Sequence, residues 1–75
     1  MSSFVRFVLK FKHDNTPLGD VARDIKDDKN LKRTWCYKTL LQYLANHGAS
    51  SSVYYILEEA NKNYINNKMI GEVVR

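Results

Sequence analysis

Apolar residues recur at helical spacing in three separate segments, and this periodicity constrains the fold more than any other feature of the sequence. In each segment the apolar side chains fall at positions i, i+3, i+4 and i+7, which is one face of an α-helix and not the alternation of a strand. The three stripes are Phe4, Phe7, Val8 and Phe11; Leu18, Val21, Ala22 and Ile25; and Tyr37, Leu40, Leu41 and Leu44. Three glycines and one proline in 75 residues allow few turns. We therefore expect one compact all-α bundle.

Residues that favour helix ends divide the chain into four expected helices. A serine at position 2 or 3 precedes the first stripe, Thr16–Pro17 precedes the second and Thr34 the third. A Ser or Thr side chain in that place accepts a hydrogen bond from a free backbone N–H of the first turn. Gly48 can end the third helix in the left-handed conformation, and serines 50–52 can cap a fourth. The expected ranges are about 3–12, 17–28, 35–47 and 51–64.

The fourth helix and the tail carry weaker patterns. We expect a helical domain over residues 1–64, and a tail over residues 65–75 that extends the fourth helix or forms a short fifth one. The tail has a weak apolar strip, made of Ile65, Met69, Ile70 and Val73. These residues either pack on the domain or bind a partner. The connector residue Leu31 should point inward, and the rest of the expected core is Phe4, Phe7, Val8, Phe11, Leu18, Val21, Ile25, Tyr37, Leu40, Leu41, Leu44, Ile56, Leu57, Ala60 and Tyr64.

Four segments carry a family resemblance. They are the aromatic-rich run 3–13, the run 17–25, Tyr43–Leu44 with His47–Gly48–Ala49, and Glu58–Glu59–Ala60 with Tyr64. With these segments the chain resembles the YozE-like family of small Firmicute proteins, which have a SAM-like (sterile-alpha-motif-like) fold. The family commonly has Trp where this chain has Asn61, and Pro near Leu31. The resemblance implies a four- or five-helix SAM-like bundle and no established activity, and fold analogy alone does not assign a function.

No residue pattern in the chain is typical of an enzyme or a metal site. Cys36 is the single cysteine, and neither His13 nor His47 is spaced as its catalytic base. The acidic stripe on the second helix lacks the glycine and the late glutamate of a calcium loop. It is interpreted as a solvated face on which Arg23 pairs with Asp27, and the alternative is a protein-docking surface. Its members are Asp20, Asp24, Asp27 and Asp28. We expect no catalytic residue, no metal and no cofactor.

A set of basic residues with nearby aromatic residues is the candidate for nucleic-acid binding. Cations neutralise phosphates and aromatic rings stack on unpaired bases, and the net charge of +4 permits a polyanionic partner. The alternative is a solvated surface around core aromatics, and the sequence does not say whether the basic clusters share a face. If Lys32 and Arg33 carry the interaction, changing both to Glu abolishes a salt-sensitive complex. The candidates are Arg6, Lys10, Lys12, Lys32, Arg33, Trp35 and Lys38.

These observations favour a non-catalytic binding module that acts mainly on an unknown protein partner. The alternative is binding to DNA or RNA through the basic set, and a structural role in a phage or mobile element is a third hypothesis that no residue tests. The lone cysteine and the absence of a signal peptide favour the cytoplasm. No stretch approaches the ~20 apolar residues of a membrane span. We expect a monomer or weak self-association.

Overall fold

The computed structural model describes the backbone of residues 3–74 and the side chains of residues 3–66. The backbone forms four helices and, in that range, no strand: α1 (Phe4–Leu9), α2 (Pro17–Asp27), α3 (Tyr37–Asn46) and α4 (Ser51–Val74). The predicted all-α fold class is confirmed.

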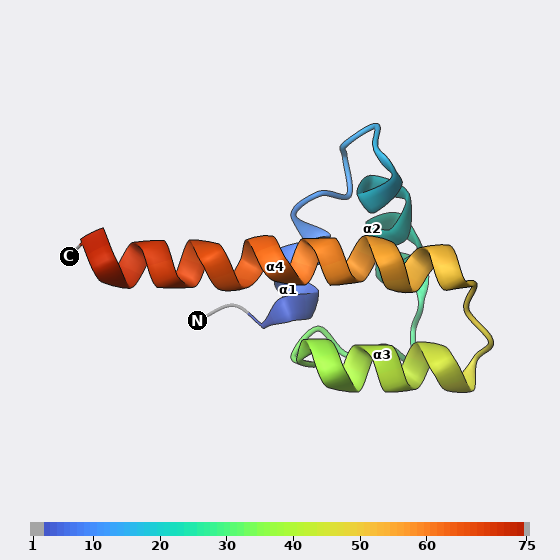
Figure 1. Ribbon diagram of the computed structural model, residues 1–75. Coiled ribbons are helices and arrows are strands. Elements are labelled where there is room, and N and C mark those ends of the chain that lie inside the picture. The colour runs from blue at the N-terminus through green and yellow to red at the C-terminus, as the bar shows by residue number, and fades with distance from the viewer. Residues whose placement is uncertain (1–2, 75) are drawn as a thin grey trace.

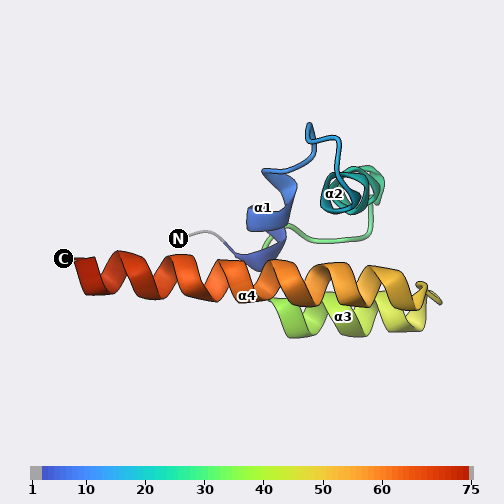
Figure 2. The same ribbon diagram turned by 45° about the horizontal axis from the view of Figure 1, so that its top comes forward.

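The four helices form two layers. In the first layer α3 and α4 run antiparallel and are joined by the turn at residues 47–50; α1 and α2 pack across one side of α4 (Figures 1 and 2). The C-terminal half of α4 extends beyond the other three helices (Figure 1). α4 is continuous to Val74, so the described backbone has no separate fifth helix. The division of the chain into a 1–64 domain and a tail stays a prediction.

The predicted capping residues begin α1 and α2 and end α3. The Ser3 hydroxyl accepts a hydrogen bond from the Arg6 N–H at 3.2 Å, and the Thr16 hydroxyl accepts one from the Gly19 N–H at 3.1 Å. Pro17 occupies the first turn of α2, where its missing N–H costs nothing. Gly48 follows α3 with φ = 72°, the left-handed conformation that glycine adopts without strain.

The predicted C-terminal end of the first helix is wrong. α1 ends at Leu9 and not at Lys12. The next residues form tighter turns in which each N–H bonds three residues back, as from Lys12 to Leu9 at 3.2 Å and from Asp14 to Phe11 at 2.9 Å. The tightening turns the chain toward the start of α2.

The predicted start of the third helix is also wrong. α3 begins at Tyr37 with Cys36 as its N-cap, and Cys36 makes no side-chain capping bond. Thr34 therefore does not cap this helix, and Trp35 lies in the connector instead of in the first turn. The reason is a tertiary hydrogen bond: the Val5 N–H donates to the Trp35 carbonyl at 3.3 Å, which holds the connector in a non-helical conformation.

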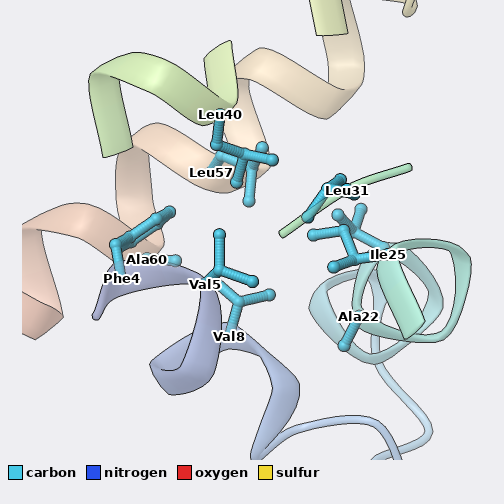
Figure 3. Close-up of a cluster of buried hydrophobic side chains, with 10 residues drawn as sticks. Phe4, Val5, Val8, Ala22, Ile25, Leu31, Leu40, Leu57 and Ala60 are labelled. Carbon is cyan, nitrogen blue, oxygen red and sulfur yellow. The ribbon is translucent and has the colours of Figure 1, made fainter. Parts of the chain in front are cut away.

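The core lies where α1 meets the other three helices, and Figure 3 shows its side chains pointing toward one another. Phe4, Val5 and Val8 of α1 are all almost completely buried. Val5 lies off the predicted apolar stripe; it is buried because α1 has neighbours on two sides. The other buried members are Val21, Ala22, Ile25, Leu31, Leu40, Leu57 and Ala60. The remaining predicted core residues are half-buried around them: Phe7, Phe11, Leu18, Tyr37, Leu41, Leu44, Ile56 and Tyr64.

The junction between α1 and α2 is held by a glycine and an arginine. A Cβ on Gly19 would collide with the Asp14 carbonyl oxygen and come within 3.0 Å of the Phe11 carbonyl oxygen, so the two backbones touch there. The Arg23 guanidinium donates to the carbonyls of Lys12 at 2.9 Å and Asp14 at 3.0 Å. The same guanidinium forms an ion pair with Asp20. The predicted pairing of Arg23 with Asp27 is wrong, because these carbonyls draw the side chain toward the start of α2.

Candidate functional site

Four of the predicted cations line one open depression of about 370 Å³. Arg6, Lys10 and Lys12 come from α1 and the turn that follows it, and Arg33 comes from the connector between α2 and α3. The half-buried Leu9 side chain completes the lining. The two basic clusters that are separate in the sequence thus share a face. We call this surface the basic depression.

Hydrogen bonds to the start of α1 explain why Arg33 reaches the basic depression. The Ser3 hydroxyl, which caps α1, also donates to the Arg33 carbonyl oxygen. Two residues further on, the Val5 N–H bonds the Trp35 carbonyl. These two contacts hold residues 33–35 against α1. The arrangement gives the depression a positive charge from two segments that are about 25 residues apart in the chain.

The other members of the predicted basic set do not line this depression. Lys32 and Lys38 are exposed elsewhere on the surface. Trp35 is half-buried, and its ring lies 5.0 Å from the ring of Tyr43, measured between centroids. Among the described residues no aromatic side chain lines the basic depression. Its chemistry suits contacts with phosphates and not stacking on bases.

A second surface is an apolar groove of about 240 Å³ at the opposite end of α2 from Gly19. It lies between the C-terminal half of α2, the connector, the end of α3 and the start of α4. Most of its lining is apolar, and two aspartates stand in it. We call this surface the apolar groove, and its lining residues are Val21, Asp24, Ile25, Asp28, Leu31, Leu44, Ala49 and Val53.

The two aspartates of the apolar groove differ in their surroundings. Asp28 is half-buried, and it accepts hydrogen bonds from the Tyr43 hydroxyl at 2.8 Å and from the Asn30 N–H at 2.9 Å. These bonds, the Tyr43 bond first, hold the pKa of Asp28 below its ordinary value. Asp24 is exposed and takes part in no hydrogen bond or ion pair with the described residues. The groove therefore carries one fixed carboxylate and one free carboxylate.

A row of three rings continues from Asp28 along α3. The centroid of Tyr43 lies 5.0 Å from that of Trp35 on one side and 4.3 Å from that of His47 on the other. Trp35 and Tyr43 are half-buried and His47 is exposed. The hydrogen bond to Asp28 raises the pKa of Tyr43, so its hydroxyl stays a donor. The row offers aromatic edges and faces next to a carboxylate.

Cys36 is exposed and lies 3.3 Å from the Thr39 hydroxyl, sulfur to oxygen. This contact, together with the nearby backbone N–H groups at the start of α3, lowers the pKa of the thiol. In the part of the chain that the structure describes, no hydrogen bond joins Cys36 to His13 or His47. No group of three or more His, Cys, Asp or Glu residues there could hold a metal ion. None of the described helices is long and apolar enough to span a membrane.

The predicted partner-binding strip on the tail is described only at its first residue. Ile65 is 45% exposed on α4, beyond the contacts that Tyr64 makes with the rings of Phe4 and Phe7. The remaining members lie outside the described side chains: Met69, Ile70 and Val73.

Sequence reasoning missed the apolar groove. Leu31 and Leu44 are each predicted to point inward, but periodicity does not reveal which helix ends leave a gap. The four-residue spacing of Asp24 and Asp28 was visible as a charged stripe; the apolar wall beside it depends on the tertiary packing.

Comparison with known proteins is consistent with this architecture. Neither the curated proteins nor the solved structures include a match. A protein-family model described as the YozE SAM-like fold matches residues 3–66, which is most of the chain. The expected resemblance is thereby confirmed, and the chain belongs to the YozE SAM-like family.

Proposed function

We propose that this protein is a non-catalytic binding module, and that the apolar groove is where it takes a protein partner. The observation that carries the proposal is an open groove with apolar walls from four separate segments. Apolar side chains left accessible in a groove are typical of a surface that takes a protein or peptide ligand. A domain of this size has little spare stability, and an apolar surface left open lowers it further.

Site-specific photocrosslinking tests this proposal. Benzoylphenylalanine replaces Asp24, an exposed member of the groove lining, or Lys26, which is exposed on the same helix and lies outside the groove. Both chains are irradiated in cells of the source organism. A discrete protein adduct at position 24 that is absent at position 26 supports the proposal. No adduct at position 24, or the same adducts at both positions, contradicts it.

The second candidate function is nucleic-acid binding, and the convergence of four cations on the basic depression favours it. Four phosphate contacts give a slope of about −3.6 for log K against log salt on duplex DNA. Affinity then falls about 100-fold between roughly 50 and 200 mM salt. Because no aromatic residue lines the depression in the described part of the chain, we expect little preference for unpaired bases.

Adjacent residues of the connector give a matched test of this second candidate. Arg33 lines the basic depression and Lys32 does not, although both are exposed cations. Binding of fluorescent duplex DNA, single-stranded DNA and RNA is measured by anisotropy at both salt concentrations. Arg33→Glu should weaken binding far more than Lys32→Glu. Equal effects, or no binding at the lower salt concentration, contradict this function.

We also propose that the protein is cytoplasmic and that it comes from a Firmicute. Cys36 is exposed and is the single cysteine, so it cannot form a disulfide within the chain. A free thiol of this kind is typical of proteins in a reducing compartment. The Firmicute origin comes from the family resemblance alone. The proposed state is a monomer or a weakly self-associating chain.

A further inference from the structure

The charges at the apolar groove are all of one sign. Asp24 and Asp28 belong to its lining, and no Lys or Arg among the described residues does. Asp20, Asp24 and Asp28 follow one another at four-residue spacing, so they share one side of α2. Asp20 is paired with Arg23, and no ion pair among the described residues neutralises Asp24 or Asp28.

The cations of α2 do not face the groove. Arg23 is directed at the turn after α1 by its bonds to the carbonyls of Lys12 and Asp14. Lys26 lies about 200° around the helix from Asp24, on the far side. A ligand in the groove therefore meets carboxylates without an opposing positive charge from the same helix.

The rings of Trp35, Tyr43 and His47 extend the preference for a positively charged ligand beyond the groove. The Tyr43 hydroxyl donates to Asp28, and the Tyr43 ring packs at a tilt against those of Trp35 and His47. A carboxylate next to an aromatic face favours a guanidinium or an ammonium group, because the ring and the carboxylate both attract a cation.

We infer that the occupant of the apolar groove is a short, basic, amphipathic helix of another protein. Its apolar side chains enter between α2 and α4, and its Lys or Arg side chains meet Asp24 and Asp28. This inference rests on the proposed function, to which it adds the chemistry of the partner. Helices recognised in this way present anchors at positions i, i+3 or i+4 and i+7.

A second copy of this chain fits the groove poorly. The positive surface that would complement Asp24 and Asp28 is the basic depression, which is itself concave. Two concave surfaces cannot insert into each other. A second copy that matched the charges of the groove would therefore bring no apolar side chains into it. A separate protein with a projecting basic helix supplies both.

Peptide selection against the full chain tests the inference. A display library of random 16-residue peptides is selected on the wild-type protein and counter-selected on Ala49→Leu, which adds apolar bulk inside the groove. Synthetic copies of the selected peptides are then titrated against Asp24→Asn and against Glu58→Gln. Glu58 is an exposed carboxylate of α4 outside the groove and serves as the matched control.

The expected result is a set of groove-dependent peptides that are net positive and carry apolar residues at helical spacing. Asp24→Asn should weaken their binding about threefold at low salt, and Glu58→Gln should leave it unchanged. Neutral or acidic groove-dependent peptides, or equal effects of the two substitutions, overturn the inference and leave the proposed function standing. A selection without groove-dependent peptides overturns both.

Sedimentation velocity of the chain alone tests whether a second copy of this chain occupies the groove. Self-association that Ala49→Leu abolishes would show that a second copy fills the groove, and it would overturn the inference. Because Asp24 is exposed and has no hydrogen-bond partner among residues 3–66, Asp24→Asn keeps the test valid if Ala49→Leu fails to fold.

Discussion

The two ends of α2 pack in opposite ways. Near its N-terminus, Gly19 lies against the backbone of the turn after α1, and Arg23 bonds two carbonyls of the same turn. Near its C-terminus, Asp24 and Asp28 border an open apolar groove between α2 and the start of α4. The first end leaves no space for even one methyl group, and the second leaves about 240 Å³.

This difference separates structural residues from residues that are free to bind. At the closed end, polar side chains satisfy the backbone of a turn, and a change there should cost stability. At the open end, the same helix presents apolar and acidic side chains that contribute less to the fold, so a change there should alter binding before stability. Each prediction below concerns one end of α2 or the turn beside the groove.

Gly19→Ala should have the largest effect, a destabilisation of about 3 kcal/mol. The added Cβ meets the carbonyl oxygens of Asp14 and Phe11, and backbone atoms cannot move aside as a flexible side chain does. In an open helix the same change stabilises by about 1 kcal/mol, so even the sign is informative. Urea denaturation measures the change. A variant more stable than the wild type would contradict the close contact between Gly19 and the turn after α1.

Arg23→Ala should cost about 1–2 kcal/mol, because two carbonyls of the turn after α1 lose their donor. Lys26→Ala, an exposed cation on the same helix, is the control and should change stability by less than about 0.5 kcal/mol. The thermal midpoint of each variant checks the difference. Equal midpoints would mean that the hydrogen bonds of Arg23 do not hold the junction.

Gly48→Ala should cost about 1 kcal/mol through backbone strain alone. Gly48 has φ = 72° and an open environment, so the added methyl meets no atom within 4 Å. Gly48 lies next to the open end of α2. Its substitution lowers stability through backbone strain, whereas substitution of Gly19 lowers stability through a steric collision. Gly48→Asn, which tolerates this conformation better, should recover part of the loss. If alanine and asparagine behave alike in urea denaturation, strain is not the cause.

Tyr43→Phe should lower stability slightly at neutral pH and less in acid. The hydroxyl lowers the pKa of Asp28, so its stabilising effect is present above the unfolded pKa of about 3.9 and is lost as the pH falls through the folded pKa. The ring contacts with Trp35 and His47 remain in phenylalanine. Thermal midpoints at pH 7 and pH 3 check this, and a gap between the two proteins that widens in acid would contradict it.

The start and the buried face of α2 were predictable, but the contacts of Gly19 and Arg23 at its closed end and the groove at its open end were not. Thr16, Pro17 and the stripe that includes Val21 and Ile25 act locally, so the start and buried face of α2 follow from short-range chemistry. The burial of Val5 does not, because it requires knowing that α1 has neighbours on two sides.

The candidate surfaces depended still more on distant contacts. Arg33 joins the cations of α1 only through hydrogen bonds between the connector and residues 3–5. The same contacts keep Trp35 out of α3, against its expected place. The apolar groove is a gap between helix ends. A sequence pattern predicts which side chains face inward, but it does not predict where the packed helices leave a gap.

Ala49→Leu gives the most direct test of the claim that the open end of α2 binds a partner and the closed end holds the fold. Binding of a basic peptide that was selected on the wild-type protein without counter-selection, followed by anisotropy, is measured beside the thermal midpoint of the same variant. We predict binding at least about tenfold weaker, equivalent to 1.4 kcal/mol, at an unchanged or higher midpoint. Unchanged peptide binding in a folded Ala49→Leu protein would contradict the account, because the groove would then not be the site.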